Sequence, residues 1–456
     1  MRCARRRQRT DGLRRTGRSS AQRRGTGGGL NPRLPIAEKP RRVRGFSFLE
    51  NARRTPRENW LLGIAAGLLY VVAILAVRWL APLTDEVTHY SQIWLFAQGQ
   101  WRVLPELTTL PGYHLVVAAI LDACGTVSLQ DARLVSAAFG LCAAAGFHAL
   151  RARLWPGTQT LATAQLLALP ILAPLLFIAY TDVLALALLL WATWASVARR
   201  HWLAAALLLG MVLVRQHWVL WSGLLALLAL RDQDLRSALR DWRASLAGMA
   251  PYLLPVLAFV AFWIGNGSIS LSPSQSALHP DLSLHTGNVL LALVVLALLL
   301  PLQVAQQLAA AWPLARARPL LLAWPLLVWA AFWFGFGADN PYNSALPGYY
   351  LHNRLSQAIN GMPWMRAAAA LLAALAAVAL ATIRLRPRLG HWLLPFGAAF
   401  LAASWLVELR YVMVPLVLWL ALREHAPRRL EWATLALWLL LATWILRGVL
   451  AQRLFL

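Results

Sequence analysis

Two adjacent carboxylates, Asp85 and Glu86, are the residues whose type and position most clearly suggest chemistry in this chain. They follow a membrane-length apolar segment, 60–80, in a sequence that is 59% hydrophobic and contains only 18 Asp and Glu. Carboxylates are costly near a bilayer and are usually kept there for a task. The pair predicts an enzyme that works on a lipid-linked substrate at the membrane surface. The alternative is two acids that only stabilise a helix start at that surface.

Arg215 is the strongest candidate for binding an anion. It lies between Val214 and Trp218 inside a long apolar run, where a guanidinium is costly unless it meets a negative group. Snorkelling of the side chain to the membrane surface is the other interpretation. Arg410 is a similar candidate, although Glu408 is close enough in sequence to form a structural ion pair with it.

The remaining polar candidates each have a second interpretation. Asp182 opens an apolar helix, where it is either a second carboxylate of the site or a helix cap. Glu86 and His89 have the i, i+3 spacing seen in metal sites on helices, but it occurs once, so a polar surface histidine is favoured and no metal is predicted. His114 follows a Pro-Gly-Tyr turn and lines a pocket or lies at the membrane interface.

The composition predicts an all-α polytopic membrane protein as the scaffold for these residues. Only 13% of the residues are charged, and 23 are Trp, a residue that favours membrane interfaces. Residues 202–230 are interrupted by the polar run Val214-Arg215-Gln216-His217, which predicts two short helices that meet at a break. Residues 411–422 form a short crossing. The other apolar segments long enough to span are 60–80, 131–150, 158–178, 181–198, 248–265, 288–308, 319–337, 365–383, 391–407 and 430–450.

The positions of the arginines predict the orientation. Arginine clusters favour the cytoplasmic side, and they alternate correctly along the chain only if 112–124 does not cross the membrane. That segment is therefore predicted to be a re-entrant or juxtamembrane helix inside a long first outer loop, 81–130. About 13 spans follow, and the outer face collects most of the unusual polar groups: Asp85, Glu86, His89, His114, Asp182, Arg215, Gln216, His217, Glu408, Arg410, Tyr411 and the loops 266–287 and 338–363.

The N-terminal segment 1–58 differs from the rest of the chain. It holds 18 Lys and Arg against 4 Asp and Glu and shows no apolar periodicity, so we expect a disordered cytoplasmic tail ahead of one membrane domain, 59–456. An over-extended gene start is the alternative. Nucleic-acid binding is not expected, because no aromatic residues alternate with the arginines. The three cysteines, Cys3, Cys124 and Cys142, have no spacing that suggests disulfides or a metal.

Several motifs occur in the order of a known family. The chain resembles the alpha-1,2-glucosyltransferases that add the terminal glucose to dolichol-linked oligosaccharide, which belong to the multi-span GT-C superfamily. The loop 268–288 departs from the family pattern, which leaves the acceptor and the donor sugar open. The matching pieces are Thr84-Asp85-Glu86, Thr108-Thr109-Leu110-Pro111-Gly112, Tyr180-Thr181-Asp182-Val183, Val214-Arg215-Gln216, His352-Asn353-Arg354 and Glu408-Leu409-Arg410-Tyr411 followed by Pro415.

The resemblance implies transfer of a hexose, with glucose favoured, from a polyprenyl-phosphate donor to an acceptor hydroxyl. The lipid phosphate is a good leaving group, so the protein mainly needs a base for the acceptor. We assign the base to Asp85 and acceptor orientation to Glu86, because neighbouring side chains point in different directions. Arg215, Arg410 and Arg354 are the expected phosphate ligands. The expected substrate-binding residues are His89, His114, Asp182, Gln216, His217, Asn353, Glu408 and Tyr411.

The sequence therefore predicts an inverting glycosyltransferase with no cofactor, in a bacterial inner membrane, with a periplasmic site and a cytoplasmic N-terminus. Its expected partners are the lipid donor, a glycan or lipid-linked acceptor, and the bilayer, without nucleic acid. A flippase or secondary transporter for lipid-linked sugars is the alternative. It would place charges at mid-membrane depth and show repeat symmetry between two halves, neither of which the sequence indicates.

Overall fold

The computed structural model of the protein describes residues 56–230, 240–272, 280–281, 283–343 and 354–454. This part is helical, with one isolated β-bridge between Leu385 and Arg423. The α-helices are α1 (Pro56–Val77), α2 (Glu86–Ala97), α3 (Gly112–Ala123), α4 (Leu129–Leu154), α5 (Gln159–Leu167), α6 (Thr181–Val197), α7 (His201–Val214), α8 (Leu220–Ala229), α10 (Trp242–Met249), α11 (Leu253–Asn266), α12 (Gly287–Leu299), α13 (Pro301–Ala317), α14 (Ala323–Gly335), α15 (Arg354–Gly361), α16 (Pro363–Thr382), α17 (Leu393–Ala402), α18 (Leu409–Leu422) and α19 (Arg428–Leu450).

Short 3-10 helices connect or extend several of these elements. They are η1 (Ala173–Phe177), η2 (Gln216–Val219), η3 (Ala250–Tyr252), η5 (Pro319–Leu322), η6 (Pro341–Asn343) and η7 (Arg388–Trp392). Five helical segments are long and apolar enough to cross a membrane, and the bent pair α12–α13 adds a sixth candidate. Seven further apolar helices are shorter. The predicted class, an all-α polytopic membrane protein, is confirmed, while the number of about 13 spans stays a prediction.

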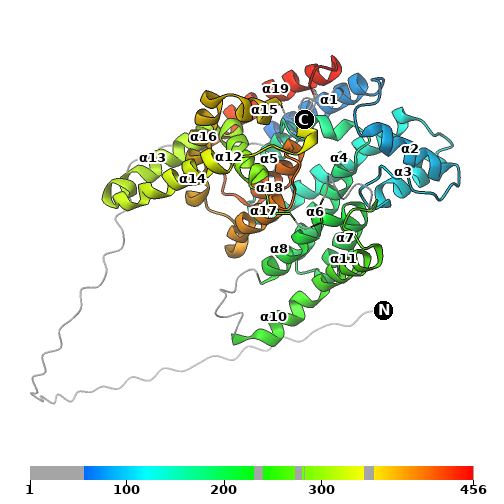
Figure 1. Ribbon diagram of the computed structural model, residues 1–456, viewed down its shortest axis with the longest axis horizontal. Helices are drawn as coiled ribbons and strands as arrows, with labels where there is room; N and C mark the ends of the chain where they lie inside the picture. Colours follow the sequence, from blue (N-terminus) through cyan, green and yellow to red (C-terminus); the bar gives the residue numbers. More distant parts are fainter. Residues whose placement is uncertain (1–55, 231–239, 273–279, 282, 344–353, 455–456) are drawn as a thin grey trace, which may run out of the picture. The chain divides into compact units, whose positions relative to one another are not determined.

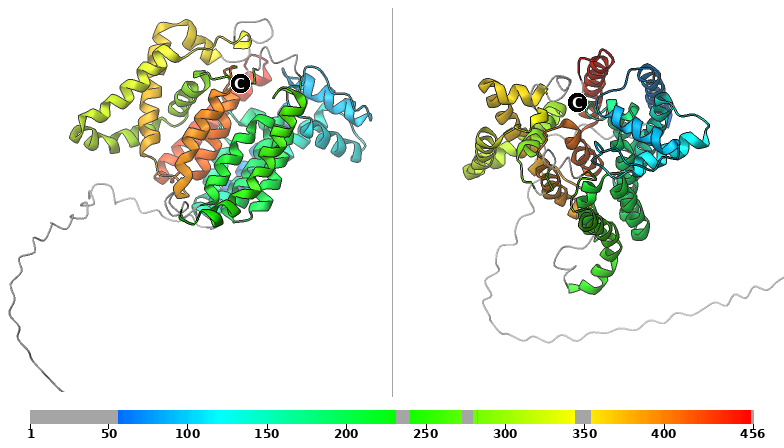
Figure 2. Two further views of the ribbon diagram at one scale, coloured as in Figure 1. Left: turned by 60° about the horizontal axis from the view of Figure 1, so that its bottom comes forward. Right: turned by 45° about the vertical axis from the view of Figure 1, so that its right-hand side comes forward.

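The core is built around α6, whose apolar side chains are almost all buried. This helix packs between α4 and α7, and α11 packs on the far side of α7. The left view of Figure 2 shows α7, α8 and α11 as neighbouring green helices. Because α6 is covered on several sides, it needs no polar face, and its sequence accordingly reads as a continuous apolar run.

Two expected continuous spans are broken in the structure. The segment 158–178 contains α5, which ends at Leu167, and then η1, and prolines occur at Pro170 and Pro174. The segment 288–308 is bent by 96° between α12 and α13, where Pro301 is the first residue of α13. Proline lacks the N–H that would continue the preceding helix, so a new helix begins there in a different direction. The break predicted at 214–217 is present, between α7 and η2.

The segment after α1 leaves the main bundle and forms two short helices that pack on each other, α2 and α3 (Figure 1). Each has 12 residues and is therefore about 18 Å long, which is too short to cross a hydrocarbon core of about 30 Å. Gly112 lets α3 approach α7 closely, because a Cβ at this position would lie 2.5 Å from the carbonyl oxygen of Leu213. This geometry agrees with the predicted juxtamembrane helix.

Candidate functional site

Asp85 lies at the start of α2, in a backbone conformation that is held by Tyr180. Thr84 has φ of 39°, a left-handed conformation that is unusual for a β-branched residue. The Tyr180 hydroxyl lies 2.5 Å from Thr84 Oγ1 and accepts a hydrogen bond from the Asp85 backbone N–H at 3.1 Å. Such strain persists only where the surroundings fix it, and it often occurs at functional sites. Tyr180 therefore positions Asp85, a role that its motif alone did not reveal.

Glu86 pairs with a different arginine from Asp85 and is completely buried. Its carboxylate accepts hydrogen bonds from Arg133 Nε at 2.8 Å and Nη2 at 2.6 Å, and from the backbone N–H groups of Leu83 and Ala179. Arg133 also donates to four carbonyl groups at the end of α1 and just after it, those of residues 77, 78, 80 and 81. The expected role of Glu86 in acceptor binding does not fit this geometry, because both oxygens are engaged in joining α1, α2 and α4.

Asp182 and Arg215 form a second buried ion pair. Arg215 Nη2 donates to Asp182 Oδ2 at 2.7 Å, and Nε donates to Thr181 Oγ1 at 2.8 Å. The pair links the first turn of α6 to the residue that caps the end of α7. Arg215 therefore has the anionic partner that its apolar surroundings require, and within the described structure its Nη1 group makes no hydrogen bond.

Arg410 joins Asp85 to Glu408. Its Nη1 group donates to Asp85 Oδ2 at 3.1 Å, and its Nε group forms an ion pair with Glu408. The guanidinium also lies over the ring of Tyr180, with Cζ 6.0 Å from the ring centroid. The sequence left open whether Arg410 binds an anion or only pairs with Glu408, and the structure shows the pairing together with a contact to Asp85.

The segment before α18, which carries Glu408, is fixed by two buried asparagines. Asn343 exchanges two hydrogen bonds with the backbone of Val407, at 2.7 and 2.9 Å. Asn288 donates to the carbonyls of Ser404 and Leu406 and accepts from the Glu408 N–H at 2.9 Å. The two side-chain amides thus satisfy backbone N–H and C=O groups of residues 404–408, as a neighbouring β-strand would. Sequence reasoning missed them, because an isolated Asn at a helix end has no distinctive pattern.

His89 and His114 form a buried pair beside Tyr180. His89 Nδ1 lies 3.0 Å from His114 Nε2, and the ring of His89 meets the edge of the Tyr180 ring. Burial lowers the pKa of His89 to about 4, while the charge of Asp85 opposes this shift. His89 is therefore neutral at physiological pH, and it is a buried residue, whereas the sequence favoured a polar surface histidine. Among the described residues, no group of three potential ligands could hold a metal ion.

Gln216, His217 and Tyr411 lie next to the ion pairs. Gln216 accepts from the Leu110 N–H at 3.0 Å and donates to the carbonyls of Thr108 and Ile269, both at 2.8 Å. It thus fastens the segment 108–110 to the loop after α11, and this occupies its amide. His217 stacks on Phe400 and meets the edge of Tyr411, so these rings form an aromatic wall.

The third expected cation, Arg354, is on a different helix from Arg215 and Arg410. Arg354 begins α15 and is exposed. His352 and Asn353 lie outside the described residues, as does the loop before them. The roles predicted for Arg354 and Asn353 therefore stay predictions.

The candidate site is defined by Asp85, His89, His114, Tyr180, Asp182, Arg215, Glu408 and Arg410. Three helices, α2, α6 and α18, begin here, so three partly positive helix ends meet its four carboxylates, counting Glu86. The side chains of Glu86, Asp182 and Glu408 are 0%, 1% and 7% exposed, whereas that of Asp85 is 39% exposed. Asp85 is therefore the carboxylate that a substrate can reach.

A comparison with known families agrees with this arrangement. The family model described as the DIE2/ALG10 family matches residues 80–241, about a third of the chain. This chain is similar to that family. The match confirms the resemblance to alpha-1,2-glucosyltransferases that the motifs predicted, and it covers Asp85, Asp182 and Arg215 but not Glu408 or Arg410.

Two solved structures are also similar, whereas no curated protein sequence matches significantly. The first is the crystal structure of ArnT from Cupriavidus metallidurans in the apo state, with 16% identity and a TM-score of 0.42 over 85% of this chain and 78% of ArnT. The second is ArnT from the same organism bound to undecaprenyl phosphate, with 15% identity and a TM-score of 0.43 over 86% of this chain and 78% of ArnT.

Proposed function

We propose that this protein is an integral-membrane glycosyltransferase that moves a hexose, with glucose favoured, from a polyprenyl-phosphate donor to an acceptor hydroxyl. The carrying observation is the difference between Asp85 and the other three acids of the cluster. All four acids are ion-paired, but Glu86, Asp182 and Glu408 are buried, while Asp85 is partly exposed at the start of α2. The family match over residues 80–241 supports the same class of reaction.

The reaction needs a base for the acceptor and a site for the leaving group. In the proposed step, an Asp85 carboxylate oxygen takes the proton of the acceptor hydroxyl. The acceptor oxygen forms a bond to the anomeric carbon as the bond from that carbon to the phosphate oxygen breaks. The bonding electrons leave with the polyprenyl phosphate. One displacement inverts the anomeric carbon, and Tyr180 and Arg410 hold Asp85 in place for it.

Arg215 and Arg410 are the proposed ligands of the donor phosphate. A guanidinium has five N–H donors, and the contacts described above use two nitrogen atoms of each. Both arginines therefore keep donors for a phosphate. The helix starts of α2, α6 and α18 add partial positive charge that favours the negative charge of the departing group.

The acceptor would lie against the ring wall of His217, Phe400 and Tyr411, with His89 and His114 on the Tyr180 side. Three residues would act indirectly, by fixing neighbouring groups of the site. Asp182 holds Arg215, Glu408 holds Arg410, and Gln216 holds the segment 108–110. Glu86 is not retained as an acceptor ligand. We place the site at the outer, periplasmic face of a bacterial inner membrane, with the N-terminus in the cytoplasm, from the arginine distribution.

The test is an assay of the purified full-length protein in detergent. Undecaprenyl-phosphate donors that carry different hexoses are incubated with a mixed pool of lipid-linked glycans, and release of free undecaprenyl phosphate is followed by chromatography. The proposal predicts release from at least one hexose donor that depends on the acceptor pool. If no donor is consumed but lipid-linked sugar crosses the membrane of reconstituted vesicles, the protein is a flippase and the proposal fails.

A further inference from the structure

A second polar cluster lies at the other end of α4. Arg133, near Asp85, and Arg151 are 18 residues apart on this helix, or about 27 Å at 1.5 Å per residue. This separation is close to the thickness of a hydrocarbon core, about 30 Å. Arg151 is buried like Arg133 and donates hydrogen bonds to the carbonyls of Leu420, Ala421 and Arg423 at the end of α18. The cluster around Arg151 therefore lies a membrane thickness away from the candidate site.

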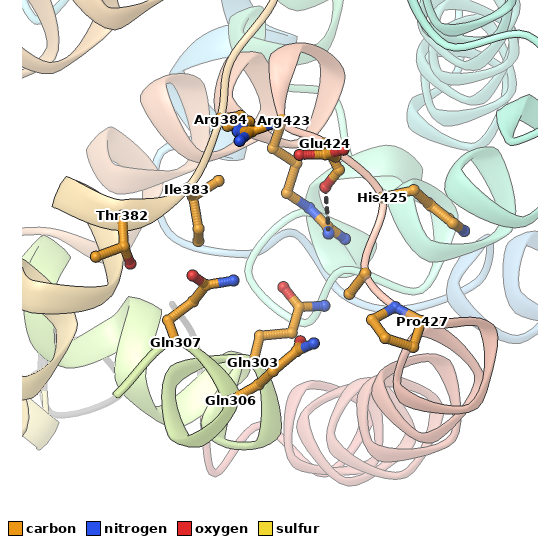
Figure 3. Close-up of a pocket in the computed structure, with 11 residues that line it drawn as sticks. Gln303, Gln306, Gln307, Thr382, Ile383, Arg384, Arg423, Glu424, His425 and Pro427 are labelled. Carbon is orange, nitrogen blue, oxygen red and sulfur yellow. Dashed lines mark hydrogen bonds between the residues drawn. The ribbon is translucent and has the colours of Figure 1, made fainter. Parts of the chain in front are cut away.

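A polar pocket opens at this end, with a volume of about 300 Å³ (Figure 3). Three glutamines on one face of α13, at i, i+3 and i+4, form one wall. The opposite walls come from the ends of α16 and α18 and from the segment before α19, and Figure 3 shows the Arg423 side chain extending between them. The lining residues are Gln303, Gln306, Gln307, Thr382, Ile383, Arg384, Arg423, Glu424, His425, Ala426 and Pro427.

The charges around the pocket are of both signs, with one positive charge in excess: Arg151, Arg384 and Arg423 stand against Glu424 and Glu431. Arg423 is neutralised by Glu431, with two hydrogen bonds of 2.7 and 2.8 Å. Arg384 and Glu424 are both exposed and are joined by a backbone hydrogen bond of 2.8 Å, so one positive and one negative side chain stand next to each other. Burial lowers the pKa of His425 to about 4, so its imidazole adds no charge at neutral pH. A ligand that carries both a negative and a positive group matches these surroundings, whereas a ligand with only positive charge does not.

Two buried polar atoms of the lining have no hydrogen-bond partner in the described structure. One is the donor Nε of Arg423, a residue that is only 3% exposed, and the other is the acceptor Oε1 of Gln306. Buried polar atoms of this kind almost always have a partner. A fitting ligand must therefore offer an acceptor to Arg423 and an N–H or O–H donor to Gln306.

We propose that this pocket binds the headgroup of a zwitterionic phospholipid with a primary ammonium group, of the phosphoethanolamine type. The phosphate oxygens would accept from Arg384 and Arg423, and the ammonium would donate to Glu424 and Gln306. The source is a membrane lipid, because the pocket lies at the membrane end marked by Arg151. In addition, Leu302 beside the glutamines is exposed, as an acyl chain in a bilayer would require.

Native mass spectrometry of the full-length protein in detergent tests this proposal. The protein receives equal amounts of phosphatidylethanolamine, phosphatidylcholine and phosphatidylglycerol with identical acyl chains, and the retained lipids are counted. Retention of phosphatidylethanolamine should exceed that of the other two by about fivefold or more. The choline group has no N–H donor, and the glycerol hydroxyls donate without the positive charge that strengthens a hydrogen bond to Glu424. Equal retention of the ethanolamine and choline lipids, or preference for the glycerol lipid, would overturn the proposal.

Two variants locate the site without touching the Arg423–Glu431 pair. Glu424→Gln and Gln306→Leu should each lower retention of phosphatidylethanolamine toward the level of phosphatidylcholine. The matched control is Glu106→Gln, an exposed acid in the first outer loop, which should bind as wild type does. Wild-type retention by the exposed-site variant Glu424→Gln would contradict the pocket as the binding site. The proposal would also be contradicted if soluble phosphoethanolamine displaced phosphatidylethanolamine at equal concentration, because the ligand would then not need to be a membrane lipid.

Discussion

At the scale of single residues, exposure separates the acids that maintain the structure from the one that can reach a substrate. Asp85 and Glu86 are neighbours in sequence, yet Glu86 is buried against Arg133 and Asp85 opens to the surface beside Arg410. Thr84, with its left-handed backbone, directly precedes Asp85 at the start of α2, and the Tyr180 hydroxyl contacts both residues. The sequence predicted separate roles for the two neighbouring carboxylates. In the structure Glu86 has a structural role, and Asp85 is the one that a substrate can reach.

Glu86→Gln should therefore damage stability more than acceptor use. The substitution leaves Arg133 buried without its counter-charge, which costs about 3–5 kcal/mol for a broken buried pair. We expect a clear drop in the thermal unfolding midpoint in detergent and a lower yield of monodisperse protein. The matched control is Asp122→Asn, an exposed acid at the end of α3. A normal unfolding midpoint combined with weak acceptor use would instead restore the role expected from the sequence.

His89 should make the protein less stable in acid. Its pKa is about 4 in the folded protein, against 6.5 for an ordinary histidine, because burial disfavours the charged form. Between pH 6.5 and 4 the unfolded chain binds a proton that folded His89 does not, so the free energy of unfolding falls as pH decreases through this window. His89→Gln should flatten this part of the stability curve, measured as unfolding midpoint against pH. Parallel curves for wild type and variant would contradict the assignment.

At the scale of elements, the candidate site is made from helix ends. The starts of α2, α6 and α18 and the end of α7 supply its ion pairs. The side-chain amides of Asn288 and Asn343 hold the chain before α18. The break between α7 and η2 could be predicted, because Arg215, Gln216 and His217 interrupt an apolar run. The breaks after α5 and α12 could not be predicted from hydrophobicity, because an apolar segment looks the same whether its helix continues or turns. Pro170 and Pro301 were the available signals.

The ion pairs between residues far apart in the sequence could not be predicted from the sequence either. Arg133 is 47 residues from Glu86, and Arg215 is 33 residues from Asp182. The cost of a buried charge predicts that each has a partner, but it does not say which acid the fold brings to it. The same limit applies to Arg151 of α4. The sequence predicted only a cytoplasmic positive charge, whereas in the structure Arg151 is buried and donates a hydrogen bond to the Arg423 carbonyl at the end of α18.

The ion pair between α6 and α7 allows a test that separates the contribution of Arg215 to stability from its contribution to donor binding. Arg215→Ala leaves Asp182 buried without its ion pair, so we expect destabilisation of about 3–5 kcal/mol. Donor binding should also weaken by about 1.5–3 kcal/mol, the scale for a lost charged hydrogen bond. Arg215→Lys should recover only part of the binding, because a point charge replaces a planar fork.

The double variant Asp182→Asn/Arg215→Ala is the control for this pair. Removing the stranded charge should recover much of the unfolding midpoint, while the dependence of turnover on donor concentration should remain weak. If the double variant also regains wild-type donor dependence, Arg215 acts only through the fold. The donor phosphate would then be assigned to Arg410.

At the scale of the whole molecule, α4 relates the two polar ends. Arg133 marks the end with Asp85, and Arg151 marks the end with the glutamine pocket. The arginine distribution predicts that the Arg151 end is cytoplasmic. Two exposed positions lie toward the opposite ends: Gln100 follows α2, and Gly157 follows α4.

Single cysteines at these two positions should react differently with an impermeant thiol reagent in intact cells. The background for the measurement is a variant in which Cys3, Cys124 and Cys142 are serine. We expect labelling at Gln100→Cys and protection at Gly157→Cys, with equal labelling of both after the membrane is permeabilised. Labelling of Gly157→Cys in intact cells would mean that 112–124 crosses the membrane, and the predicted orientation would be wrong.

The central claim is that Asp85 is the catalytic base, and Asp85→Asn tests it most directly. The amide keeps the shape of the carboxylate but cannot take a proton, so the variant should fold and bind the lipid donor. Its rate of undecaprenyl phosphate release at saturating substrates should fall by about 100-fold or more, the scale for losing a positioned general base. A folded Asp85→Asn protein that turns over at a near-normal rate would contradict the claim.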